Sequence, residues 1–179
     1  MADWKIAYNW MMDNEDAPRA CLRVPDACPN GVAGPCFAIC GINSAVFPAE
    51  FAAIAVLPQE SRKTPVQQFY QIHFWNKWYA QLDSDDLCKR VFDFAINAGA
   101  GASLRCLQQA INSLAALDAA HLAEDGRWGW ATVTAANAAD TQALRSAFTA
   151  RRVAYYRAIA AAHPEKQRYL DEWIARAEK

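Results

Sequence analysis

A glutamate near the N-terminus stands where a carboxylic acid could serve as a proton donor. Trp4, Tyr8 and Met11 recur at i, i+4 and i+7, which predicts a helix over residues 3–15 with one apolar stripe, and Glu15 continues that stripe. Burial and the negative end of the helix dipole would both raise the pKa of Glu15. An acid still protonated near neutral pH can donate to a leaving oxygen, as glycosidic cleavage requires. The alternative is a surface glutamate that points into water, which is the commoner outcome for this residue type.

A second carboxylate follows in an irregular segment, residues 18–47, that is rich in proline. Asp26 could act as a base or as the electrostatic partner of Glu15, or it could only form an Asx turn. Asn43, near the end of the same segment, could orient water or sugar hydroxyls. A long loop of this kind either carries function or needs a covalent staple.

Two polar residues four positions apart, Asp93 and Asn97, lie within the apolar stretch Val91–Gly99 and share one helix face. Buried polar side chains need hydrogen-bond partners. The pair could bind a saccharide from the floor of a cleft, or it could tie helices together.

Aromatic residues are dense just upstream, at Tyr70, His73, Phe74 and Trp75. Aromatic rings pack well against sugar faces, but at helical spacing most of them are expected in the core. Of these residues, Tyr70 and Trp75 are the candidates for contact with a sugar. His73 has no visible cysteine or aspartate partner that would make it part of a nucleophilic triad.

Four of the six cysteines, Cys21, Cys28, Cys36 and Cys40, are clustered in the irregular segment. An even count and clustering favour disulfides in an oxidising compartment, so we expect at least two of the four to be bonded. A zinc site of four cysteines is the alternative, but the short paired spacings typical of such sites are missing.

The remaining chain is predicted to be helical, because alanine is abundant and only seven glycines are present. We expect an all-α fold with a possible small hairpin in the 20–45 loop. The chain should form a single domain, residues 1–179, with a catalytic part at 1–65 and a helical body at 66–179. Its later helices are expected at 65–82, from Ser84, at 104–114, at 140–162 and after Pro164.

Charge is nearly balanced, with 18 Lys and Arg against 19 Asp and Glu, so nucleic acid is not expected as a partner. No apolar run reaches the roughly 20 residues of a membrane span, and the N-terminus lacks the features of a signal peptide. We expect a monomer made in the cytoplasm. Action in the periplasm or cell wall would then depend on a holin or a secretion machine.

The order and spacing of these segments, together with three later motifs, resemble glycoside hydrolase family 108. This family contains the N-acetylmuramidases of phage endolysins and bacterial secretion-activator proteins. The later motifs are Leu107-Gln108-Gln109-Ala110, Asp125-Gly126-Arg127-Trp128-Gly129 and Arg151-Arg152-Val153-Ala154-Tyr155-Tyr156. The resemblance implies an enzyme that cuts the β-1,4 bond between N-acetylmuramic acid and N-acetylglucosamine in bacterial peptidoglycan. It implies no metal or cofactor, and a peptidoglycan-binding region near the C-terminus.

Within the resemblance, Glu15 matches the family's catalytic glutamate and Gly41-Ile42 matches a closing Gly-Ile pair. Asp16-Ala17 replaces the two glycines that follow the glutamate, and Ala38 stands where the family has a threonine. No residue clearly replaces the group that positions water in related lysozymes. Two other functions therefore remain open: an inactive cell-wall-binding protein on a lysozyme scaffold, and a lytic transglycosylase, which needs only the acid.

Overall fold

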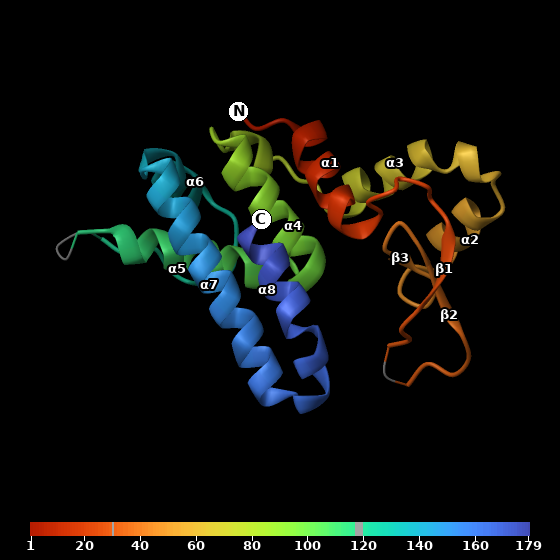
Figure 1. Cartoon of the computed structure of the whole chain (residues 1–179). Helices are drawn as coiled ribbons and strands as arrows, with labels where there is room; N and C mark the ends of the chain where they lie inside the picture. The colour runs from red at the N-terminus through yellow and green to blue at the C-terminus, as the bar shows by residue number, and fades with distance from the viewer. Residues whose placement is uncertain (30, 117–119) are drawn as a thin grey trace. The chain divides into compact units, whose positions relative to one another are not determined.

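The computed structural model describes residues 1–29, 31–116 and 120–179. It is mainly helical with one small antiparallel sheet, which confirms the expected fold class (Figure 1). Contacts divide the chain into two compact units. We call Tyr8–Trp75 the N-terminal unit, and Met1–Ala7 together with Asn76–Lys179 the C-terminal unit.

The N-terminal unit combines a three-stranded sheet with short helices. Helix α1 (Trp4–Glu15) leads into it, and the sheet has the order β1-β2-β3. Both strand pairs are antiparallel, and helix α2 packs against β2 and β3. The hairpin expected in the 20–45 loop is therefore present. The other elements of this unit are β1 (Arg23–Asp26), β2 (Cys36–Ile39), β3 (Ile42–Asn43), α2 (Pro48–Ala55), η1 (Gln59–Ser61) and α3 (Lys63–His73).

The C-terminal unit is a bundle in which α7 packs against both α5 and α8. Side-chain caps set two of its helix starts: Ser84 Oγ accepts from the backbone N–H of Leu87, and Asp140 accepts from that of Ala143. Its elements are η2 (Tyr79–Gln81), α4 (Asp85–Ala98), α5 (Ala100–Leu114), α6 (Trp130–Ala138), α7 (Thr141–Ala162), η3 (Pro164–Tyr169) and α8 (Leu170–Glu178).

The helix expected over 65–82 is shorter in the structure. It ends at His73, and the backbone at Phe74 has left the helical region with a φ of −125°. The side chain of Asn76 then accepts a hydrogen bond from the backbone of Trp78, an arrangement that competes with helix continuation. Periodicity alone missed this local competition.

The Asp125-Gly126 turn is held by one buried side chain of α5. Gln108 Oε1 accepts from the backbone N–H of Gly126, and Gln108 Nε2 donates to Asp125 Oδ1 at 2.9 Å. That hydrogen bond holds the pKa of the Asp125 carboxyl below its usual value. Thr132 is buried two residues inside α6. The turn therefore acts as a scaffold for the start of this helix.

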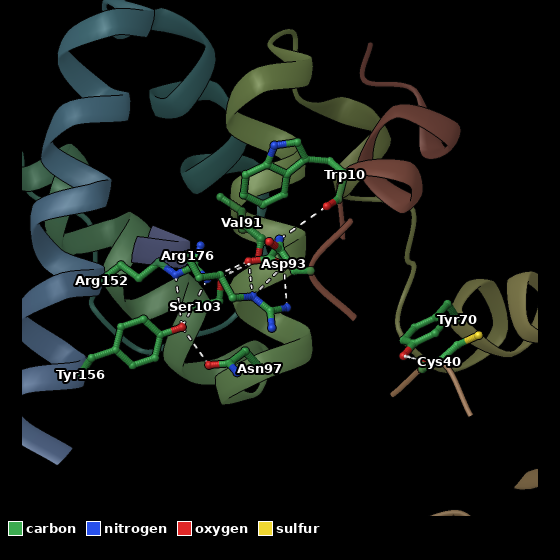
Figure 2. A network of polar contacts seen from close by, with 11 residues as sticks. Trp10, Cys40, Tyr70, Val91, Asp93, Asn97, Ser103, Arg152, Tyr156 and Arg176 are labelled. Carbon is green, nitrogen blue, oxygen red and sulfur yellow. Dashed lines mark hydrogen bonds and ion pairs between the residues drawn. The ribbon is translucent and has the colours of Figure 1, made fainter. Parts of the chain in front are cut away.

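A buried carboxylate joins three helices of the C-terminal unit. Asp93 on α4 has no exposed surface; its Oδ2 lies 2.7 Å from Arg152 Nη2 of α7, and its Oδ1 lies 2.7 Å from Arg176 Nη2 of α8. Tyr156 accepts from Arg152 and donates to Asn97 Oδ1 at 2.7 Å (Figure 2). The Asp93 carboxylate thus ties the three helices together, which is the second of the two alternatives, and it has no exposed surface for a saccharide.

No helix in the described part of the chain has the length and apolar character needed to cross a membrane.

The Asp93→Ala variant should have a much lower free energy of unfolding for the C-terminal unit than the wild type. Two arginines would keep their charge in a buried site without a counter-ion, at a cost of about 3–5 kcal/mol. Urea or thermal unfolding measures the loss. The matched control is Asp171→Ala on the exposed face of α8, which should cost less than about 1 kcal/mol. Equal losses for the two variants would contradict a central role for Asp93.

Candidate active site

Glu15 is the last residue of α1 and lies against the turn between β2 and β3. Gly41 occupies that turn with a φ of +77°, a conformation that favours glycine. A Cβ added at Gly41 would lie only 2.6 Å from Glu15 Oε2 and 2.8 Å from Tyr70 Oη. A side chain at this position would therefore displace the carboxylate. Glu15 is partly buried and Gly41 is exposed, so the carboxylate lies beside the protein surface.

Tyr70 forms the other wall beside Gly41. Its ring is buried on α3, and its hydroxyl donates to the backbone carbonyl of Cys40 at 2.7 Å (Figure 2). The ring lies 6.2 Å from that of Tyr8 on α1, and burial raises the pKa of Tyr8 to about 12. Tyr70 therefore offers the site a hydroxyl that already donates to the Cys40 carbonyl, and a packing surface.

The loop after Glu15 is fixed by polar contacts rather than by apolar packing. Asp16 Oδ2 accepts from the backbone N–H of Cys21 at 2.9 Å, and Arg19 binds Asp13 of α1 at 2.6 Å. Arg62, just before α3, donates to the carbonyl of Cys21 at 3.0 Å. Asp16, which replaces a family glycine, thus closes the turn that follows the catalytic candidate.

The cysteines of this unit fall into two pairs. Cys28 and Cys36 form a disulfide, so the expectation that at least two of the four cysteines are bonded holds in the structure. A zinc site of four thiolates is excluded there, because two of the sulfurs are already joined. Cys21 and Cys40 are buried thiols whose sulfurs lie 3.1 Å apart, and Cys40 Sγ is 3.3 Å from Asp16 Oδ2. Burial holds the pKa of the Cys40 thiol well above its usual value.

Asp26 and Asn43 bind each other across the sheet. Asp26 Oδ2 accepts from Asn43 Nδ2 at 2.7 Å, and Asp26 Oδ1 accepts from the N–H of the next residue. In the register of the sheet, Asp26 is opposite Cys36, at the end of β2 far from the Gly41 turn. Both carboxylate oxygens of Asp26 thus have partners within the loop and the sheet.

The other candidates have different surroundings. Trp75 is partly buried just after α3, and His73 Nε2 lies 3.2 Å from a carboxylate oxygen of Glu50. Asp93 and Asn97 belong to the C-terminal unit, where Asn97 is exposed at the end of α4. The structure therefore brings Glu15 together with Gly41 and Tyr70, whereas Asp26 and Asn43 form a separate pair.

The sequence interpretation missed the roles of Asp16 and of the Cys40 carbonyl. Neither has a motif signal of its own, since one is a turn contact and the other a backbone atom. The match of Gly41-Ile42 to the closing Gly-Ile pair was the available signal for the turn itself.

Among known proteins, a family model matches the C-terminal part of the chain, and a solved structure aligns with nearly all of it. Residues 102–178 match the family model described as Predicted Peptidoglycan domain, which associates the C-terminal part of the chain with peptidoglycan. The solved structure of SagA from Brucella abortus aligns with a TM-score of 0.58 and 18% sequence identity. The alignment covers 96% of this chain and 91% of that chain. At this identity the likeness shows a shared fold. No curated protein sequence matches the chain.

Gly41→Ala should destabilise the N-terminal unit more than Gly34→Ala does. Both glycines have a positive φ, but a Cβ at Gly34 meets nothing within 4 Å. The shared backbone strain should cost about 1–2 kcal/mol in each variant. The clash with the buried Tyr70 should add about 1–3 kcal/mol at Gly41 only. Urea unfolding of the two variants measures the difference, and equal midpoints would mean that no close approach exists at Gly41.

Alkylation should separate the bonded cysteines from the free ones. Unfolded, unreduced protein should take up four iodoacetamide adducts and reduced protein six, as read by intact mass. In the folded protein at pH 8 the four thiols should react slowly. They are buried, and burial raises the pKa of Cys88 to about 12 and that of Cys106 to about 11. Rapid labelling of the folded chain would argue against buried thiols.

Proposed function

We propose that this protein is a peptidoglycan hydrolase of the lysozyme type, an N-acetylmuramidase in which Glu15 is the general acid. The observation that carries the proposal is the position of the Glu15 carboxylate beside an exposed glycine, with a tyrosine hydroxyl on the other side. The match of residues 102–178 to a peptidoglycan domain supports the cell wall as the substrate.

In this mechanism Glu15 donates its proton to the glycosidic oxygen as the bond to the anomeric carbon breaks. The absence of a side chain at Gly41 lets the Glu15 carboxylate lie directly against the exposed β2–β3 turn. Tyr70 and the Cys40 carbonyl hold the turn in place, so the acid meets the substrate in one orientation.

A lytic transglycosylase is the second candidate reaction. It is favoured by the position of Asp26, whose two oxygens already bind Asn43 and the backbone. Without a carboxylate that activates water, the 6-hydroxyl of the muramic residue would attack the anomeric carbon and yield an anhydro product. For the biological setting we propose a phage endolysin, with a secretion helper as the alternative.

Glu15→Gln should abolish the release of muropeptides from purified peptidoglycan while the fold survives. The amide keeps the shape of the side chain but has no proton to transfer, and the rate should fall about 100-fold or more. Mass spectrometry of the soluble products measures the rate. Glu60→Gln, at an exposed site of the same unit, is the matched control and should cut normally.

The products and one further variant then separate the candidates. Reducing-end muramic acid identifies hydrolysis, and an anhydro product identifies transglycosylation. Asp26→Asn should impair hydrolysis if Asp26 is the base, whereas transglycosylation would continue. More than a tenth of the wild-type rate in Glu15→Gln, or no product from the wild type, would overturn the proposed activity.

A further inference from the structure

The C-terminal unit contains a pocket of about 320 Å³ that the proposed reaction does not use. It lies between the end of α4, the second half of α7, η3 and α8. Its lining includes four aromatic rings, one amide and one cation: Tyr155, Tyr156, Tyr169, Trp173, Asn97 and Lys166.

The aromatic rings form a continuous wall. Trp173 stacks on Tyr156 with ring centres 5.3 Å apart and on Tyr169 with ring centres 5.8 Å apart, both at an angle of 27°. Tyr169 and Trp173 are partly buried, and the Arg168 guanidinium lies over the Tyr169 ring, 4.6 Å from its centre. The part of the aromatic surface that stays accessible suits the C–H faces of a sugar ring, because a sugar presents apolar faces and a polar rim.

Two polar side chains of the pocket, Asn97 and Lys166, offer hydrogen-bond donors. Asn97 Oδ1 is occupied by the Tyr156 hydroxyl at 2.7 Å, and the Asn97 amide N–H groups make no hydrogen bond within the described chain. The Lys166 side chain forms no ion pair with any described residue, whereas the neighbouring Glu165 carboxylate lies 3.6 Å from His163. An amide donor and an uncompensated ammonium call for a ligand with a carbonyl oxygen and a negative charge.

We propose that this pocket binds an anionic, N-acetylated amino-sugar segment of the peptidoglycan glycan. The sugar lies on the aromatic wall, its acetamido oxygen accepts from Asn97, and a carboxylate pairs with Lys166. This inference rests on the proposed cell-wall substrate but not on the chemistry of Glu15. The carboxylate has two possible sources, the lactyl group of muramic acid and the attached stem peptide.

The test measures binding of the full chain carrying Glu15→Gln, so that no probe is cut. Three soluble probes of equal length are titrated by calorimetry: a muramic-acid glycan without peptides, the same glycan with stem peptides, and neutral chitin oligosaccharide. At least one acidic probe should bind about fivefold or more tightly than chitin. Lys166→Gln should remove that preference, and Tyr169→Leu should weaken binding of all three probes.

Arg157→Gln is the matched control, because it removes one exposed positive charge from α7 outside this pocket. It should leave all three affinities within twofold. The inference is overturned if Lys166→Gln keeps the preference for acidic probes, or if chitin binds as tightly as both of them. Circular dichroism checks the fold of Tyr169→Leu; if that variant unfolds, the Lys166 result decides.

The two proposals can fail separately. If the wild type leaves peptidoglycan uncut but Lys166 still controls the acidic preference, only the proposed activity is wrong. If the wild type cuts peptidoglycan and Lys166→Gln binds all probes like its parent, only the proposed binding role of the pocket is wrong.

Discussion

The C-terminal unit depends on the burial of one negative charge. Removing a carboxylate from water is costly, and Asp93 is stable in its position only because two guanidinium groups face its two oxygens. The requirement fixes α7 and α8 against α4. It also fixes Tyr156, whose hydroxyl lies between Arg152 and Asn97 and whose ring carries Trp173. The aromatic wall of the pocket is therefore a consequence of the same ion pair.

The N-terminal unit depends on a close approach of backbone and side chain. Glu15 can lie over the β2–β3 turn because residue 41 has no side chain and can adopt a positive φ. The Tyr70 hydroxyl holds the turn by donating a hydrogen bond to the Cys40 carbonyl. The Cys28–Cys36 disulfide, which closes an eight-residue separation, stabilises the sheet by about 2–3 kcal/mol in the chain-entropy model.

Much of the fold could be predicted from local patterns. The apolar stripe through Trp4, Tyr8 and Met11 predicted α1, which ends at Glu15 as expected. Ser84 predicted the start of α4, and the irregular segment predicted both a small hairpin and a disulfide. Asp93 and Asn97 could be recognised as a polar pair on one helix face, but not assigned a partner. Helix periodicity failed at Phe74, where a side-chain contact of Asn76 competes with the helix.

The sequence by itself determined most of the helices, which carboxylate ends the first helix, and which polar residues must find partners. These depend on spacing and on neighbours in the chain. Only the tertiary structure decided that Gly41 and Tyr70 meet at Glu15, that Asp26 binds Asn43, and which cysteines are bonded. The reason is that each of these contacts joins residues separated in sequence, and their distance depends on how the segments pack. A buried aspartate at position 93 requires partners, and the packing of α7 and α8 against α4 makes Arg152 and Arg176 those partners.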